Sequence, residues 1–173
     1  MQNFERRLMG GHPNSIGNTV EIVAEVLAQP TYFDELFHCY FSEDEVVRLR
    51  TSNTMKRLAK ENHALLLPYL DRLLTDVAKI DQASTQWTLA QLFLLYQKEL
   101  TPTQKAQATA IMQSNLAHHQ DWIVLNQTLE TLARWSQKDD ELKTWLLPHL
   151  TRLAADERKS ITRRAGKWLE KLR

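Results

Sequence analysis

The sequence predicts an all-α fold, an α-α superhelix of about four helical hairpins that follow an N-terminal capping helix. The four glycines are at positions 10, 11, 17 and 166, so the 148 residues from Asn18 to Ala165 contain none. Primed hairpin turns and phosphate-binding loops favour glycine at positive φ, which argues against a β fold. Residues 66–73 read LLPYLDRL and residues 146–153 read LLPHLTRL, 80 positions later. That offset suits two repeat units of about 40 residues each.

The second helix of each predicted hairpin carries five apolar or small residues at relative positions 0, 4, 7, 8 and 11. This spacing places side chains on one face of a helix. The four sets start at residues 47, 85, 124 and 161, so the period is 37 to 39 residues. The sets are Val47, Thr51, Thr54, Met55 and Leu58; Thr85, Leu89, Leu92, Phe93 and Tyr96; Val124, Thr128, Thr131, Leu132 and Trp135; and Ile161, Ala165, Trp168, Leu169 and Leu172.

An amphipathic first helix is expected before each second helix. Thr101 followed by Pro102 is a good N-cap and N1 pair, and Asp121 and Ser84 are expected to begin later helices in the same way. The predicted first helices cover residues 31–41, 62–80, 102–118 and 139–155.

The N-terminal end is expected to be sealed by one more helix at residues 18–28, with Val20, Val23, Val26 and Leu27 on one face. Residues 1–17 are predicted to form a flexible segment, with a loop from Gly10 to Asn18. A chain of this length and apolar content can bury roughly 70% of its unfolded surface. Residues 18–173 are therefore predicted to form a single repeat domain.

These paired helices resemble HEAT repeats of the armadillo-type α-solenoids. Pro68 and Pro148 match the proline in that family's first helix, and Val47-Arg48 after Asp44 matches its Asp-x-x-Val-Arg signature. The resemblance covers about residues 31–172. It departs at Gln86, Leu125 and Thr162, where the signature arginine would fall, so the polar ladder between repeats is expected to be incomplete. The resemblance implies a HEAT-like fold, and its members are mostly binding scaffolds of diverse specificity.

The composition indicates which partners and which cellular compartment to expect. Lys and Arg number 22 against 21 for Asp and Glu, which makes no general case for nucleic acid or membrane. Cys39 is the only cysteine, which excludes an internal disulfide and a Cys-rich zinc site. The first fifteen residues lack the apolar run of a secretory signal, and no apolar stretch approaches the ~20 residues that span a bilayer. We therefore expect a cytoplasmic protein that is not inserted in a membrane.

A search for chemistry yields no catalytic residue, metal ligand or cofactor site. Cys39 follows His38 directly, but neighbours on a helix point about 100° apart, so Cys39 is interpreted as a packed, inert residue. Neither His118 nor His119 has a His, Asp or Glu at i+4 that would form a two-ligand face on one helix. The acidic runs 43–45 and 139–141 lie at expected helix starts, where carboxylates satisfy free amide groups.

Two of the five tryptophans, Trp135 and Trp168, occupy core positions of the repeat and are predicted to be buried. Trp87 lies off the core stripe. It is expected either to pack on a neighbouring repeat or to remain partly exposed.

The second helices also carry a basic flank at relative positions 3, 6, 10 and 13, and in stacks of this type these helices line the concave surface. The flank comprises Arg50, Arg57, Lys60, Lys98, Arg134, Arg164, Lys167 and Lys171, against the single acid Glu130. Residues 150–173 hold eight basic and three acidic side chains, a net charge of +5. One interpretation is that these cations end helices and solvate the C-terminus. The other is that they form a groove for an acidic partner.

The leading hypothesis is a non-catalytic scaffold that holds an acidic protein segment. Its predicted contacts are Arg50, Arg57, Lys60, Arg134, Arg164, Lys167 and Lys171. The alternative is a nucleic-acid-binding protein resembling the HEAT-built alkylated-base glycosylases, for which Glu130 is the only candidate carboxylate. A third hypothesis is an enzyme that resembles the HEAT-like bilin lyases, with Cys39 beside His38 as its only hint. The sequence does not indicate the identity of a partner or the oligomeric state.

Overall fold

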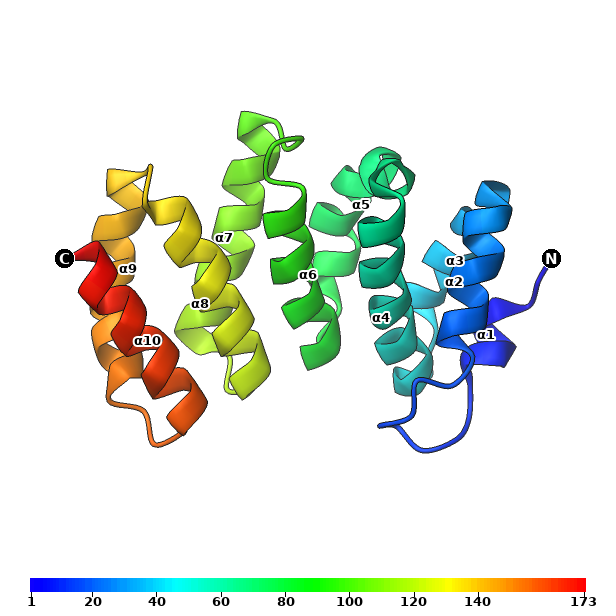
Figure 1. The fold of residues 1–173 in the computed structure, drawn as a ribbon, viewed down its shortest axis with the longest axis horizontal. Helices are drawn as coiled ribbons and strands as arrows, with labels where there is room; N and C mark the ends of the chain where they lie inside the picture. The colour runs from blue at the N-terminus through cyan, green and yellow to red at the C-terminus, as the bar shows by residue number, and fades with distance from the viewer. The chain divides into compact units, whose positions relative to one another are not determined.

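The protein is entirely helical, which confirms the predicted all-α class (Figure 1). The computed structural model describes residues 1–173 and contains no strand. Contacts along the chain gather into two compact units, Met1–Thr88 and Leu89–Arg173, and the boundary falls inside helix α6 (Ala83–Leu95). Whether these two units form the single domain predicted for residues 18–173 depends on how they are joined, so that domain stays a prediction.

The first unit is organised around α4 (Glu45–Glu61), which packs against three shorter helices, α1, α2 and α3. Asp44 caps α4, because its Oδ1 accepts hydrogen bonds from the amides of Val46 at 2.7 Å and Val47 at 3.3 Å. The other helices of this unit are α1 (Phe4–Leu8), α2 (Thr19–Ala28), α3 (Phe33–His38) and α5 (Leu70–Thr75).

The first helices of this unit are broken, unlike the continuous helices predicted at 31–41 and 62–80. Short 3₁₀ segments, Pro30–Tyr32 and Cys39–Phe41, flank α3. A longer one, His63–Tyr69, precedes α5, and Val77–Lys79 follows it. Pro68 lies inside the longer segment. A proline there lacks an amide donor and clashes with the preceding turn, which favours an α-helix that begins only at Leu70. Pro148, in contrast, lies inside the continuous helix Asp140–Ala154.

The N-terminal segment predicted to be flexible is packed in part, whereas residues 9–18 are exposed. Phe4 and Leu8 are fully buried in α1. The loop from Gly10 to Asn18 is present as expected, and the Arg50 guanidinium holds it in place. Its Nη1 donates to the carbonyls of Leu8 and Gly10, both at 2.6 Å, its Nη2 to His12 at 3.2 Å and its Nε to Ser15 at 3.1 Å.

The second unit contains four regular helices. They are α7 (Pro102–His118), α8 (Trp122–Ser136), α9 (Asp140–Ala154) and α10 (Lys159–Leu172). Consecutive helices pack against one another, and α8 also packs against α10. Thr101 and Gln104 form a reciprocal capping box at the start of α7, and Asp121 and Asp139 cap α8 and α9. The predicted bounds of 102–118 are confirmed.

The core positions predicted for the four second helices are buried, with one exception. Leu169 alone among these twenty residues is partly exposed. The caps predicted at Thr101 and Asp121 are confirmed, whereas Ser84 is not a cap. It lies buried inside the first turn of α6, where its hydroxyl accepts a hydrogen bond from the side chain of Gln82 at 2.9 Å.

Candidate functional site: two basic clefts

The structure separates the seven predicted contact residues into three groups. Arg50 is a correction: it is only 3% exposed, and its donors are used by the N-terminal loop, so it is not a surface contact. Arg134 and Lys171 are engaged on their own surface, Arg134 with Glu130 at 2.7 Å and Lys171 over the Trp168 ring at 4.7 Å. The remaining four residues line two clefts, one in each unit: Arg57, Lys60, Arg164 and Lys167.

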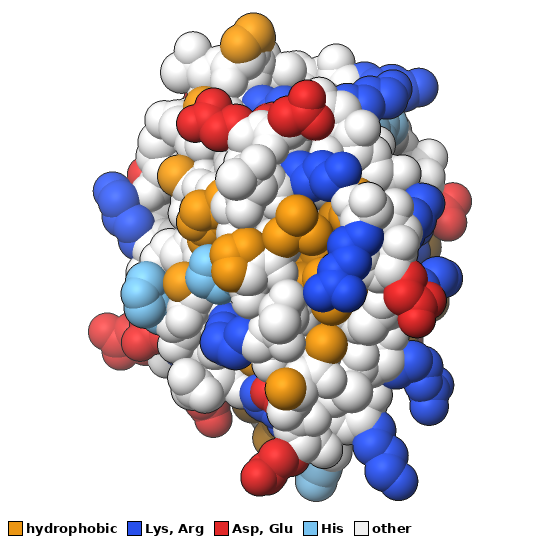
Figure 2. Space-filling view, turned by 90° about the vertical axis from the view of Figure 1, so that its left-hand side faces the viewer, with side chains coloured by type: hydrophobic (Ala, Val, Ile, Leu, Met, Phe, Trp, Pro, Cys, Tyr) orange, Lys and Arg blue, Asp and Glu red, His pale blue; other side chains and the backbone are white.

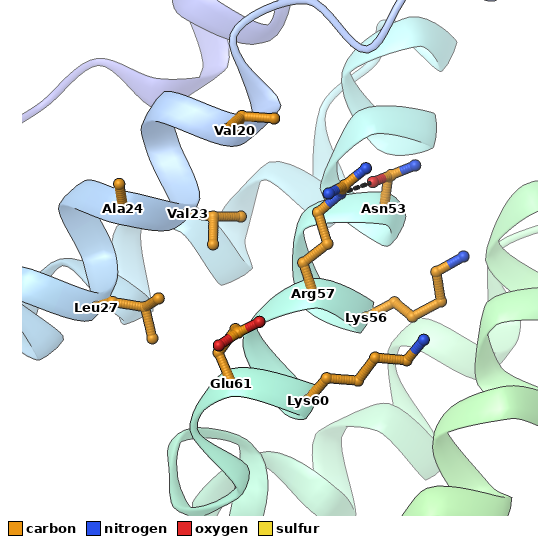
Figure 3. Close-up of a pocket in the computed structure, with 9 residues that line it drawn as sticks. All are labelled: Val20, Val23, Ala24, Leu27, Asn53, Lys56, Arg57, Lys60 and Glu61. Atoms are coloured by element: carbon orange, nitrogen blue, oxygen red, sulfur yellow. Dashed lines mark hydrogen bonds between the residues drawn. The ribbon is translucent and has the colours of Figure 1, made fainter.

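The first of these, the α2–α4 cleft, has one apolar wall and one basic wall (Figure 3). Its volume is about 570 Å³. The apolar wall is formed by Val20, Val23, Ala24 and Leu27 of α2, and the basic wall by Asn53, Lys56, Arg57, Lys60 and Glu61 of α4.

The two helices present these walls because each buries another face. Helix α2 turns Ile22, Val23 and Val26 into the core, which leaves Val20 53% exposed at the edge of the cleft. Helix α4 buries the face predicted from the sequence. Its polar residues on the other face therefore border the cleft. The Nε of Arg57 donates to the Oδ1 of Asn53 at 2.8 Å, which fixes the orientation of the guanidinium (Figure 3).

Three cations and a single carboxylate, that of Glu61, line the α2–α4 cleft. Burial lowers the pKa of Lys56, and the charges of Lys60 and Arg57 lower it further. Lys56 and Lys60 make no hydrogen bond or ion pair. The three cations repel one another, and a bound anion would reduce this repulsion. The anion would also be attracted by positive charge that no carboxylate of the protein neutralises.

The second cleft, the α8–α10 cleft, has a volume of about 620 Å³. Trp122 stands 50% exposed at its edge, and Arg163 and Lys167 are exposed and form no ion pair. Figure 2 looks onto the end of this unit, where Lys and Arg side chains gather along one side and apolar side chains occupy the centre. The lining residues are Trp122, Ile123, Asn126, Gln127, Glu130, Ser160, Arg163, Arg164, Lys167 and Trp168.

Glu130 is the only acid of the α8–α10 cleft, and it is held by its neighbours. Its Oε2 accepts from Trp168 Nε1 at 2.8 Å, and its Oε1 accepts from Arg134 Nε at 2.7 Å. Burial raises the pKa of Glu130, but these two hydrogen bonds and the charges of Arg134 and Arg164 outweigh it and lower the pKa overall. Glu130 is therefore ionised at neutral pH and orders the cations around it.

Arg164 also has a structural role, since its Nη1 donates to the backbone carbonyl of Asn126 at 3.0 Å. Asn126 is 4% exposed, and its Nδ2 donates to Ser160 Oγ at 3.2 Å. The Oδ1 of Asn126 accepts no hydrogen bond. Arg163 and Lys167 are thus the freest cations of this cleft.

Reasoning from the sequence missed Lys56, Arg163, Trp122 and the apolar wall of α2. A signal for the two cations is present in the sequence. In each cleft a basic residue directly precedes a predicted one, as Lys56-Arg57 and Arg163-Arg164. The two side chains of such a pair point about 100° apart around the helix axis. Both can therefore border the same broad cleft. The apolar wall could not be anticipated, because it depends on which side of α2 the core leaves uncovered.

Other predicted residues lie away from the clefts. Cys39 is 4% exposed, and burial, with smaller contributions from Glu5 and Glu35, raises its pKa to about 12. The thiol is therefore protonated at neutral pH, which disfavours a role as nucleophile. Trp135 and Trp168 are buried as predicted, and Trp87 is partly buried beside Leu49.

Comparison of the sequence with protein-family models, with curated proteins and with solved structures finds no match. None of its helices combines the length and the apolar character needed to cross a membrane.

Proposed function

We propose that the protein is a binding scaffold of stacked HEAT-like hairpins that holds an acidic segment of a protein partner. The observation that carries this proposal is the repeated chemistry of the two clefts. Each combines three cations, one carboxylate and apolar side chains. No side chain of either cleft needs to act as a catalyst for this function.

The HEAT-like part of the proposal is supported by polar contacts at the repeat spacing within each unit. In the first, Gln82 Nε2 donates to the carbonyl of Glu45, 37 residues away, at 2.9 Å. In the second, the bonds from Arg164 to Asn126 and from Trp168 to Glu130 both join residues 38 apart. These separations match the 37 to 39 residue period, as expected when equivalent positions of successive repeats lie side by side.

The apolar surface in each cleft favours a protein over a phosphate backbone. Aliphatic and aromatic side chains gain free energy from leaving water, by about 25 cal/mol per Å² buried, whereas sugar and phosphate offer little apolar area. The net charge of +1 also provides no broad positive field to concentrate a polyanion. Recognition here depends on local charge combined with apolar contact.

The test is the affinity of a fluorescein-labelled peptide of glutamate and serine, measured by anisotropy. Reversing both free cations of the α8–α10 cleft, Arg163→Glu with Lys167→Glu, should weaken binding by about tenfold or more, since desolvated charge contacts contribute most of it. The matched control, Lys98→Glu with Lys138→Glu, makes the same change in net charge at exposed residues outside the clefts. Equal affinities for the two double variants would reject the α8–α10 cleft as a binding surface.

Nucleic-acid binding is the second candidate, because Trp122 is half exposed beside Arg163 and Lys167. An aromatic ring among cations suits a stacked base. A single-stranded oligonucleotide should then bind at ~50 mM salt and lose orders of magnitude in affinity by ~200 mM. The glycosylase version of this hypothesis is less well supported, since both carboxylate oxygens of Glu130 already accept hydrogen bonds.

A further inference from the structure

The α2–α4 cleft differs from the α8–α10 cleft in having a continuous apolar wall. This wall restricts the kinds of molecule that can fill the cleft. In Figure 3, Val20, Ala24 and Leu27 lie along α2, whereas the extended side chains of Lys56 and Lys60 leave α4 in the direction away from α2. Resting on the function proposed above, we infer that this cleft binds an amphipathic acidic α-helix of the partner. Its aliphatic side chains would pack on α2, and its carboxylates would face Lys56 and Lys60.

The apolar wall has the dimensions of a helix-binding surface. Val20, Ala24 and Leu27 stand at i, i+4 and i+7 on α2. At 1.5 Å per residue they form a stripe about 10 Å long, which equals two turns of a facing helix. A partner that repeats aliphatic residues at the same spacing can cover the whole stripe, and this is how amphipathic helices enter apolar grooves.

The cations are spaced to suit the same helix. Lys56 and Lys60 are four residues apart on α4. Their attachment points are therefore separated by about 6 Å along the helix axis, the separation of two carboxylates placed one turn apart on a partner helix. Arg57 belongs to the same basic wall. Asn53 holds only its Nε, so its terminal nitrogens can still donate to an acidic side chain.

Other occupants match only part of this cleft. A small inorganic anion leaves the wall of Val20, Ala24 and Leu27 uncovered. A fatty acid covers the wall but brings one carboxylate to three cations. A nucleic-acid strand brings several charges but little apolar surface. An acidic helix supplies both components, and its charges would relieve the mutual repulsion of Lys56, Arg57 and Lys60.

The experiment compares three labelled peptides of equal charge, each about fifteen residues long so that a helix can form when bound. In the patterned peptide, leucines share one face at i, i+4 and i+7. In the scrambled peptide the same leucines are spread around the helix, and in the third peptide serine replaces leucine. Full-length protein should bind the patterned peptide at least about tenfold more tightly than the scrambled one, because each buried aliphatic side chain contributes roughly that factor.

Protein variants assign the binding to the cleft. Val20→Gln with Ala24→Gln changes two exposed residues of the wall without changing charge, and it should abolish the advantage of the patterned peptide. Ala28→Gln, at an exposed position of the same helix outside the cleft, should preserve it. Lys56→Gln with Lys60→Gln should weaken all three peptides by about fivefold at low salt, whereas Lys79→Gln should not.

The outcomes separate this inference from the function on which it rests. Equal binding of all three peptides, unaffected by the Val20 and Ala24 changes, would overturn the amphipathic helix while leaving acidic-peptide binding intact. Failure of all three to bind would overturn both proposals. If dodecanoate displaces the patterned peptide but unlabelled peptide does not, the cleft binds an amphiphile. If only an oligonucleotide displaces it, the cleft binds nucleic acid. Either result rejects the helix.

Discussion

Replacing Arg50 with alanine is expected to destabilise the first unit more than any change at an exposed arginine. The guanidinium is buried and donates to four carbonyls, that of Leu8 at the end of α1 and three in the loop; the bonds to Leu8 and Gly10 are 2.6 Å long. Hydrogen bonds to charged groups contribute roughly 1.5–3 kcal/mol each. The loss is smaller here, because the loop carbonyls can bond to water once Arg50 is removed. We therefore expect Arg50→Ala to lower the free energy of unfolding by about 3–4 kcal/mol, a large share of a typical 5–15 kcal/mol.

The assay is urea denaturation followed by circular dichroism, together with limited proteolysis of residues 9–18. Arg50→Ala should shift the midpoint and speed cleavage in the loop. Arg50→Lys should fall between the variant and the wild type, because a single ammonium cannot reproduce the fork of the guanidinium. Arg57→Ala is the control and should change stability by less than ~0.5 kcal/mol, since Arg57 is exposed. A loss below ~1 kcal/mol for Arg50→Ala, with unchanged proteolysis, would refute the idea that Arg50 fastens the loop.

Two glycines and one carboxylate give further predictions. Gly17→Ala should cost roughly 1–2 kcal/mol in thermal unfolding, because Gly17 has a φ of 52° and a Cβ would lie 3.0 Å from Arg50 Cζ. Gly166→Ala should instead stabilise by about 0.5–1 kcal/mol, since a Cβ in this helix meets nothing within 4 Å. Hydrogen bonds from Arg158 lower the pKa of Asp156 to about 2, below its ordinary 3.8. The stabilisation from Asp156 should therefore be present above about pH 4 and disappear as the pH falls towards 2, and urea titrations of Asp156→Asn should lack that part of the pH dependence.

The second helices could be predicted from the sequence because their signal is local. Residues at i, i+4, i+7, i+8 and i+11 face one direction whatever they pack against, so the buried side of each helix follows from spacing alone. The caps at Thr101 and Asp121 are equally local, because each side chain bonds to amides two or three residues away. The broken first helices were harder to predict, since several short 3₁₀ segments leave the apolar spacing almost unchanged.

The position that follows the first predicted core residue of each second helix makes a similar local contact with different residue types. Arg48, Gln86 and Thr162 differ in type, yet each donates to a carbonyl in the segment before its own helix. Leu125 is the exception and is buried. An incomplete polar ladder was predicted from the missing arginines. The bonds of Gln86 and Thr162 are local and do not join one predicted repeat to the next, so the incomplete ladder stays a prediction.

The candidate site was only partly predictable. The sequence identified the basic flank, but Arg50 of that flank is covered by a loop 35 to 42 residues away in the chain. Helical periodicity gives the direction of a side chain and not what lies over it. Contacts between distant segments decide burial, and they likewise decide that the exposed stripe of α2 lies beside the cations of α4.

Binding of an acidic segment in the two basic clefts can be located residue by residue by NMR. Amide chemical shifts of ¹⁵N-labelled protein would be followed during titration with the patterned acidic peptide. We expect shifts concentrated in residues 20–27, 53–61 and 160–167, with little change in residues 62–80. Shifts centred on residues 62–80, or saturable binding with no change in either cleft, would contradict this expectation.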